Sequence, residues 1–252
     1  MDREVILEAR GLTKRFGGIV ANHNIDMKLY EREIIAIVGD NGAGKSTLIK
    51  AISGIYQPEG GEIYIRGQKV EIHNPIDAKS HGIETVYQDE GLIRLFNPSM
   101  NLFLGRERLR KNVFGKLLRL VDYRFMRNET EKLLERIDIR LKDINAEVSA
   151  LSGGQRQSVV VGRAVYWGSK IIILDEPTNN LGVKEERKII ELIKTLRDKH
   201  DMSVIVISHN INHVFELVDR IIVLRNGEKV GERLKKETNI NEIVSMITGV
   251  AE

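Results

Sequence analysis

The sequence lacks several features that mark particular classes of protein. It has no cysteine, which excludes disulfides and thiolate metal sites and favours a cytosolic protein. Its apolar runs, such as Ile34 to Val38, fall far short of the roughly 20 residues that a transmembrane helix needs. The start, Met1 to Glu4, is too polar for a secretory signal peptide. We therefore expect a cytosolic chain without a membrane span.

A strong charge of one sign is also missing. The 252 residues contain 39 Lys and Arg against 36 Asp and Glu, a net charge of +3. Proteins that bind nucleic acids usually carry a clustered basic excess, and none stands out along the chain, so we expect no nucleic-acid partner. With 42% hydrophobic and 30% charged residues, the composition is that of an ordinary folded protein of one or two domains.

What is present is the pattern of an α/β protein. Apolar residues alternate over residues 5–9 and 25–29, which predicts half-buried strands. Continuous apolar runs, typical of strands buried on both faces of a parallel sheet, occupy residues 34–38, 171–174, 204–207 and 221–224. Helical stretches separate the later runs, so that part of the chain is predicted to form βαβ units.

Residues from about 90 to 150 differ in character. Apolar residues there follow helical spacing, and Asp122 is a candidate helix cap. We predict a mainly helical insertion of about 60 residues between two halves of the sheet domain. Farther on, Asn226-Gly227 predicts a tight hairpin turn, and residues 239–248 predict one more short helix.

A glycine-rich loop directly follows the apolar run 34–38 and precedes a helical pattern. Strand, loop and helix in this order are the context that the Walker A phosphate-binding motif requires. Its glycines let backbone N–H groups surround phosphate oxygens, while Lys45 would reach the β and γ phosphates and Ser46 would bind Mg²⁺. These features alone indicate only a nucleoside triphosphate, since GTPases and kinases share them. The predicted nucleotide-binding residues are Gly39, Asp40, Asn41, Gly42, Ala43, Gly44, Lys45, Ser46 and Thr47.

Two acids close the apolar run 171–174. Asp175 and Glu176 stand at a strand end, where ligands bind in open α/β sheets. Asp175 is placed to hold Mg²⁺ through water, and Glu176 to act as the general base on the attacking water. The alternative is a solvated acidic strand end. The guanine motif Asn-Lys-x-Asp does not occur in the chain, which speaks against a GTPase.

A second glycine-rich helix start lies about 20 residues before Asp175. Leu151 precedes Ser152, Gly153, Gly154 and Gln155, and a helical pattern follows them. As an isolated pentapeptide this is equally well a helix cap. A helix N-terminus is also an anion site, and one ATP cannot easily use two such sites in one compact domain. We therefore predict that this segment caps the γ-phosphate bound by a facing subunit.

With these motifs together, the sequence resembles the nucleotide-binding subunits of ABC transporters over about residues 4–249. The simple-sugar importer branch is most similar, on the segments Gly39 to Thr47, Thr85 to Asp89, Asn101 to Glu107 and Leu181 to Glu185, of which the last two are more particular to that branch. The resemblance implies a P-loop NTPase fold of the α/β class. It implies a mixed sheet core (1–89 and 156–252) with an N-terminal antiparallel β subdomain and a helical subdomain at about 90–155, in one domain.

The resemblance also implies roles for single residues. Gln88 would contact Mg²⁺ and the attacking water, and would link the site to the helical subdomain. His209 would hydrogen-bond the γ-phosphate, and Phe16 would stack on adenine. One departure is Gly182, where many members of the family carry Asp in the loop toward the partner. It removes no ligand, and it bears on how the two sites communicate.

The implied function is ATP hydrolysis that energises an importer, with a monosaccharide as the solute. The implied cofactors are ATP and Mg²⁺. The implied partners are a second ATPase subunit in a homodimer, integral membrane permease subunits and a separate extracytoplasmic solute-binding protein, with this chain peripheral at the cytoplasmic face. Alternatives are an ABC exporter motor and a soluble ABC-type ATPase that acts on nucleic acid or ribosomes. The long coiled coil typical of the soluble class is not predicted.

Overall fold

The structure is a computed structural model that describes the chain except residues 1–3, 88–90, 138, 140, 180 and 251–252. The chain divides into two compact units. The first comprises residues 1–88, 169–177 and 193–252, and the second comprises 89–168 and 178–192. The second unit thus includes residues 156–168 and 178–192, which were predicted from the sequence to belong to the core.

The first unit contains two sheets. An antiparallel sheet has the order β2-β1-β4-β5, formed by β1 (Val5–Phe16), β2 (Ile19–Tyr30), β4 (Gly60–Ile65) and β5 (Gln68–Val70). A mixed sheet has the order β10-β9-β3-β8-β7-β6. Its strands are β3 (Ile34–Val38), β6 (Ile83–Val86), β7 (Ile171–Asp175), β8 (Ser203–Ile207), β9 (Arg220–Arg225) and β10 (Glu228–Leu234).

The continuous apolar runs of the sequence are the central strands of the mixed sheet. Every residue of β3, β7 and β8 is buried, as expected for strands covered on both faces. Strands β9, β3, β8, β7 and β6 run parallel to one another, and β10 returns antiparallel to β9 through the turn at Asn226 and Gly227. Both turn residues have positive φ, 50° and 80°, as a two-residue hairpin turn requires. The structure confirms the predicted fold class.

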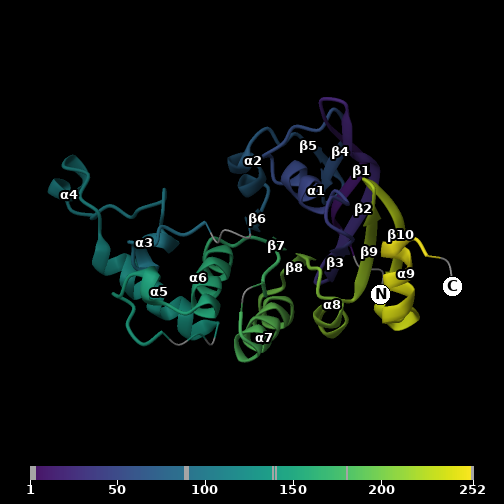
Figure 1. Ribbon diagram of the computed structural model, residues 1–252. Coiled ribbons are helices and arrows are strands. Elements are labelled where there is room, and N and C mark those ends of the chain that lie inside the picture. The colour runs from purple at the N-terminus through teal and green to yellow at the C-terminus, as the bar shows by residue number, and fades with distance from the viewer. Residues whose placement is uncertain (1–3, 88–90, 138, 140, 180, 251–252) are drawn as a thin grey trace. The chain divides into compact units, whose positions relative to one another are not determined.

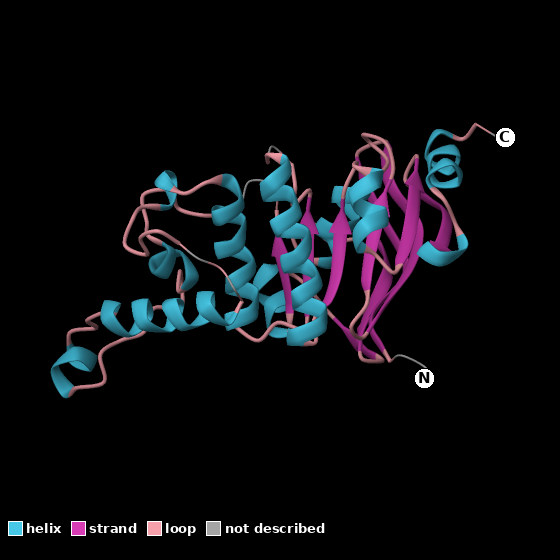
Figure 2. Ribbon diagram, turned by 90° about the horizontal axis from the view of Figure 1, so that it is seen from below, coloured by secondary structure: helices cyan, strands magenta, loops and turns pink. Residues whose placement is uncertain are grey.

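The helices of the first unit are α1 (Lys45–Ile52), α2 (Pro75–Ser80), α8 (Ile211–Leu217), α9 (Ile240–Thr248) and the 3₁₀ turn η2 (Lys235–Glu237). The second unit holds α3 (Pro98–Leu102), α4 (Val113–Leu117), α5 (Tyr123–Arg136), η1 (Val148–Ala150) and α6 (Gly153–Tyr166). Helix α7 (Val183–His200) begins in the second unit and ends in the first. Figure 2 shows the strands gathered in the first unit and helices in the second.

The second unit has its own core. Phe103 is buried, and its ring meets the rings of Phe125, Tyr166 and Trp167 edge to face, with centroids 4.9 to 6.4 Å apart. These rings join α5 and α6 to the end of α3, an arrangement that aromatic quadrupoles favour. Asp122 caps α5 as predicted, because its side chain accepts from the amide of Phe125. Among the described helices of the whole chain, not one combines the length and the apolar character that crossing a bilayer demands.

Candidate functional site

The order of the mixed sheet brings the predicted phosphate loop and the predicted acids together. Strands β3, β8 and β7 are neighbours and parallel, so their carboxyl ends lie at one edge of the sheet (Figure 1). The glycine-rich loop follows β3, Asp175 ends β7, and His209 comes two residues after β8. Ligands of open α/β sheets bind at this edge.

The loop that precedes α1 depends on glycine. Gly39 has φ 153°, and a Cβ there would lie 2.2 Å from the carbonyl oxygen of Leu224. Gly44 has φ 97° and caps α1, and a Cβ there would lie 2.4 Å from the carbonyl oxygen of Ala21. No side chain caps α1. The first amides of this helix are therefore left for a ligand, as in an anion site.

Lys45 holds the loop in a compact form. Its Nζ donates to the carbonyl oxygens of Gly39 and Asp40, at 2.6 and 2.9 Å. Burial lowers the pKa of Lys45, while the nearby charges of Glu176, Asp175 and Asp40 act in the opposite direction. A half-buried ammonium held by two carbonyls at a helix start is a group that phosphate oxygens can recruit.

Asp175 lies next to the start of α1. The residue is 8% exposed, and burial is the main cause that raises the pKa of its carboxyl group. The charge of Glu176 raises it further, whereas Lys50 and a hydrogen bond with Ser46 lower it. A carboxylate and a hydroxyl within hydrogen-bond reach are the oxygen ligands that Mg²⁺ prefers. The described residues hold no cluster of three or more metal-binding side chains, so Mg²⁺ would depend on phosphate oxygens for its remaining ligands.

Glu176 and His209 form a direct pair. Nδ1 of His209 lies 2.9 Å from Oε2 of Glu176, and the contact is an ion pair when the imidazole is protonated. Glu176 has φ 53°, an uncommon value for a residue with a side chain, and its amide donates to the carbonyl of Ile207 at 2.9 Å. Strained backbone of this kind often accompanies a functional position. The side chains of Glu176 and His209 are 14% and 64% exposed, so water reaches the pair.

Phe16 ends β1, close to the turn into β2. Its residue is 42% exposed, its ring meets Tyr56 edge to face at 5.1 Å, and Nζ of Lys14 lies 5.3 Å from its centroid. Tyr56 thus fixes the ring while part of Phe16 stays accessible. A fixed and accessible aromatic face suits stacking against a base.

Asn22 is a residue that no sequence motif predicted. It is 1% exposed on β2, and its Nδ2 donates to the carbonyl of Gly44 at 3.1 Å. Its Oδ1 is buried and has no hydrogen-bond partner among the described residues. A second backbone support comes from the turn after β9, where the amide of Gly227 donates to the carbonyl of Ala43. Neither contact has a local sequence signal, because both join the loop to residues far away in the chain.

Gln88 lies outside the described residues, so its prediction is not addressed by the structure. The residue before it, Tyr87, is described. Its hydroxyl donates to Oγ of Ser53 at 2.6 Å, and burial raises its pKa. This bond ties the end of β6 to the end of α1.

The predicted signature segment begins α6 in the second unit. Ser152 is the N-cap, and a capping box is complete: the amide of Gln155 donates to Oγ of Ser152, and the amide of Ser152 donates to Oε1 of Gln155. A Cβ on Gly153 would lie 2.6 Å from a methyl of Leu181, and one on Gly154 would lie 3.2 Å from Cβ of Glu185. The segment thus forms a helix cap within its own unit, and its two glycines pack against Leu181 and Glu185.

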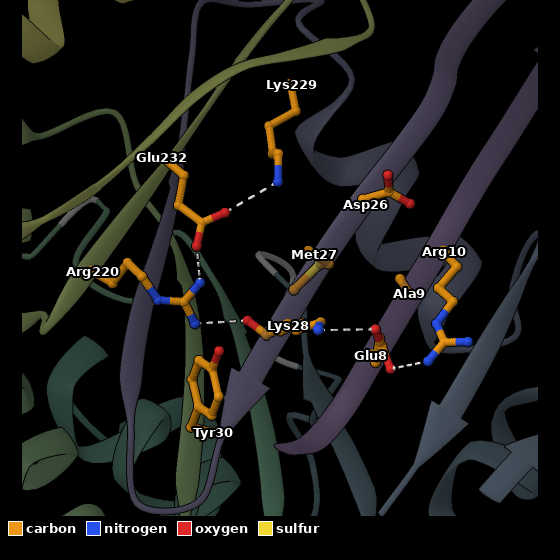
Figure 3. A pocket seen from close by; sticks show the side chains of 10 residues that line it. All are labelled: Glu8, Ala9, Arg10, Asp26, Met27, Lys28, Tyr30, Arg220, Lys229 and Glu232. Atoms are coloured by element: carbon orange, nitrogen blue, oxygen red, sulfur yellow. Dashed lines mark hydrogen bonds and ion pairs between the residues drawn. The ribbon is translucent and has the colours of Figure 1, made fainter. Parts of the chain in front are cut away.

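A cavity of about 420 Å³ lies elsewhere in the first unit, lined by residues of β1, β2, β9 and β10 (Figure 3). Most of its charged side chains are paired with one another, and the carboxylate of Asp26 accepts from the amide of Gly11. Glu232 contacts Arg220 and Lys229, while Glu8 contacts Arg10 and Lys28. None of the predicted site residues lines it. We interpret this cavity as a structural joint between the two sheets.

Comparison with known proteins gives the family. The family model described as ABC transporter matches residues 22–179. The fructose import ATP-binding protein FrcA of Rhizobium meliloti is 43% identical over 100% of this chain and 97% of its own. The xylose/arabinose import ATP-binding protein XylG of Sulfolobus acidocaldarius is 44% identical over 98% and 95%. The ribose import ATP-binding protein RbsA of Caldanaerobacter subterraneus is 37% identical, and only 48% of its length is covered.

Solved structures of ATP-binding cassettes have the same fold as this chain. A nucleotide-free ATP-binding cassette from an ABC transporter superposes with a TM-score of 0.82 at 22% identity, over 98% of this chain and 100% of the other. A dimeric post-hydrolysis cassette bound to ADP and phosphate gives a TM-score of 0.74 at 27% identity, over 92% and 100%. The chain therefore belongs to the ABC transporter family, as an ATP-binding cassette of the ATPase type.

Proposed function

We propose that this chain is the motor subunit of a monosaccharide importer. The observation that carries the proposal is similarity over the whole chain, at 43% and 44% identity, to the ATP-binding proteins of a fructose and a xylose/arabinose import system. Because both relatives are covered almost completely, the similarity is not confined to the motifs that all cassettes share. The two compact units then act together as one ATPase domain.

The first unit binds the nucleotide. Phe16 stacks on the base, and the loop of residues 39–47 surrounds the phosphates with its backbone amides. Lys45 exchanges its two carbonyl partners for phosphate oxygens. The packed glycines and the open start of α1 support this role.

Ser46 and Asp175 provide ligands for Mg²⁺, together with Gln88. The buried carboxylate of Asp175 and the adjacent hydroxyl of Ser46 fit a hard cation. When bound, Mg²⁺ neutralises charge that develops on the phosphates.

Glu176 acts as the general base, and His209 positions it. The carboxylate of Glu176 accepts the proton of the attacking water. The contact between Nδ1 of His209 and Oε2 of Glu176 fixes the orientation of that carboxylate, and the exposed imidazole is free to contact the γ-phosphate. Gln88 couples this site to the helical unit.

The second unit completes the site of another copy. Ser152, Gly153, Gly154 and Gln155 present the start of α6 to a nucleotide held by a second, identical chain. The known dimeric cassette with bound ADP and phosphate supports such pairing. The dimer sits at the cytoplasmic face of the membrane and drives permease subunits that receive their solute from an extracytoplasmic binding protein.

The test combines partner capture with transport. A Glu176→Gln form, which binds ATP without turning it over, is purified with Mg-ATP from native membranes in mild detergent, and Lys45→Ala serves as the control. We expect a multi-span permease and a sugar-binding protein to copurify. Reconstituted in liposomes with the wild-type chain in place of Glu176→Gln, the complex should take up one of fructose, xylose, arabinose or ribose with ATP hydrolysis. Ribosomal or DNA-repair proteins without a permease would contradict the proposal.

A further inference from the structure

Residues 106–121 form a basic segment within the second unit, named here the basic hairpin. It contains six Lys or Arg and one Glu, a net charge of +5, whereas the whole chain has +3. The expectation that no clustered basic excess exists is therefore wrong. Acidic residues elsewhere in the chain balance this cluster in the net charge.

The basic hairpin has a defined backbone. Leu109 pairs with Val121 in an antiparallel bridge, and the amide of Arg110 donates to the carbonyl of Leu120 at 2.9 Å. Helix α4 forms the tip. A Cβ on Gly115 would lie 2.3 Å from Oδ1 of Asn112, which shows how tightly the tip is folded. Figure 1 shows α4 standing away from α3, α5 and α6.

The tip exposes large apolar side chains. Val113, Phe114, Leu117 and Leu118 are 78%, 72%, 75% and 63% exposed. By contrast, Phe103 in the core of the same unit is 2% exposed. Single exposed apolar residues are common, but four within six residues form a patch that indicates an interaction surface.

The cations divide into two groups. At the base, the guanidinium of Arg106 lies over the ring of Trp167 at 4.7 Å, and that of Arg108 over Phe125 at 5.8 Å. These contacts hold the hairpin to its unit. Nearer the tip, Arg110, Lys111 and Arg119 are exposed and make no ion pair within the described part of the chain. Their charge is available to a partner.

Two further cations follow the hairpin closely in the chain. Arg124 and Arg127, at the start of α5, line a hollow of about 430 Å³ together with Tyr123 and three uncharged polar residues. Arg127 is partly engaged, because its Nε lies 3.7 Å from Glu131. The two arginines and the amphipathic side chain of Tyr123 at this hollow suit a lipid headgroup with a negative charge.

We propose that the basic hairpin binds the surface of an anionic lipid membrane directly. Apolar side chains beside unpaired cations in one short element are typical of segments that lie in a membrane interface. The cations are attracted to anionic headgroups, and the apolar side chains leave water for the acyl boundary. A nucleic acid would match the charge and leave the apolar tip exposed. This binding requires neither nucleotide nor permease, so it goes beyond the proposed function.

The experiment is vesicle flotation with the purified full chain, without nucleotide. Vesicles are phosphatidylcholine alone, or roughly one part phosphatidylserine to two parts phosphatidylcholine. We expect flotation with the anionic vesicles only, weakening as salt is raised because exposed charges are screened. Equal flotation with neutral vesicles, or none with either, would overturn the proposal.

Two triple variants separate the contributions. Arg110→Gln/Lys111→Gln/Arg119→Gln and Val113→Ser/Leu117→Ser/Leu118→Ser should each lower binding by about tenfold or more, with ATP hydrolysis in solution unchanged. A matched control, Arg66→Gln/Lys69→Gln/Lys236→Gln, removes three exposed cations of the first unit, with side chains 50%, 55% and 77% exposed. It should bind as wild type does. If the control lost as much vesicle binding as the hairpin charge variant, net charge alone would explain the effect. That result would overturn the proposal.

A final arm addresses other partners. The wild type and the apolar variant are mixed with a DNA fragment in place of vesicles. DNA binding that the apolar variant retains, with no vesicle binding by the wild type, would assign the hairpin to nucleic acid. Binding only to vesicles that carry the permease would assign it to a protein partner. Either result would overturn the proposal.

Discussion

Helix α1 begins directly after a glycine-rich loop and α6 begins with two glycines, yet their starts are built in opposite ways. Gly44 caps α1 in a left-handed conformation, and no side chain satisfies the first amides. Ser152 and Gln155 close a capping box at the start of α6. An uncapped start leaves its donors to a ligand, whereas the capping box of α6 satisfies the amides of Ser152 and Gln155 within its own chain and leaves those of Gly153 and Gly154 outside the box. The comparison explains why we place the phosphates at α1 and give α6 a contributing role from a second copy.

The largest loss of ATP hydrolysis should follow from a substitution at the start of α1. Lys45→Ala removes the ammonium that we propose to contact the phosphates, and we expect ATP hydrolysis to fall on the order of 10²- to 10³-fold. Lys236→Ala, at a side chain that is 77% exposed, serves as the control and should hydrolyse ATP at the wild-type rate. Steady-state phosphate release measures both. Near-normal hydrolysis by Lys45→Ala would mean that the phosphates bind elsewhere.

Glycine substitutions compare the two helix starts directly. Gly44→Ala forces a side chain into φ 97° and to within 2.4 Å of a backbone carbonyl, so we expect a loss of about 1–3 kcal/mol in unfolding free energy. Gly154→Ala has an ordinary φ and a nearest contact of 3.2 Å with a side-chain atom. There we expect a change below about 1 kcal/mol, because alanine favours the helix. Urea unfolding measures both, and equal losses would contradict the distinction.

The capping box gives a smaller effect. Ser152→Ala removes the hydroxyl that accepts from the amide of Gln155, and such losses cost about 1 kcal/mol of stability. Binding of ATP to the single chain should not change, since α1 supplies that site. Ser152→Thr keeps the cap and should recover the stability. A change in the ATP affinity of the isolated monomer would show that α6 contributes to the site within one chain.

The smallest effect is a pH dependence from Asp175. Burial raises the pKa of its carboxyl group in the folded state above the unfolded value. The folded state therefore binds a proton more readily, so the ionised carboxylate costs stability above that pKa. This cost in stability is relieved as the pH falls through the raised pKa. It returns as the pH rises through that pKa. Relative to Asp175→Asn, the wild type should gain stability on mild acidification without Mg²⁺, measured by urea unfolding across the acidic range.

How far the sequence predicts the site depends on the range of the contacts. The phosphate loop is local, because its glycines, Lys45 and Ser46 follow one another, and the structure shows the predicted strand, loop and helix. Asn22 supports Gly44 from 22 residues away, and no periodicity marks it. The pair of Glu176 and His209 became plausible only through strand order, since parallel neighbours align the ends of β7 and β8.

The fold itself shows the same limit. Buried strands were predicted from continuous apolar runs. In the antiparallel sheet, the alternation of apolar and polar residues predicted only residues 5–9 and 25–29 as strands. Strands β1 and β2 each have 12 residues. Register shifts between them interrupt the period that alternation detects. The basic hairpin was missed for another reason: its charge disappears in the total, and its exposed apolar tip is recognisable only once burial is known.

The most direct measurement is the mass in solution of Glu176→Gln with and without Mg-ATP, by light scattering after size exclusion. We predict a particle of 28.6 kDa without nucleotide and one of twice that mass with it, because we propose that the start of α6 binds the phosphates held at α1 of a second copy. The same form carrying Ser152→Phe should stay a monomer. If Glu176→Gln binds ATP and remains a monomer, the assignment of α6 to the partner's nucleotide is wrong.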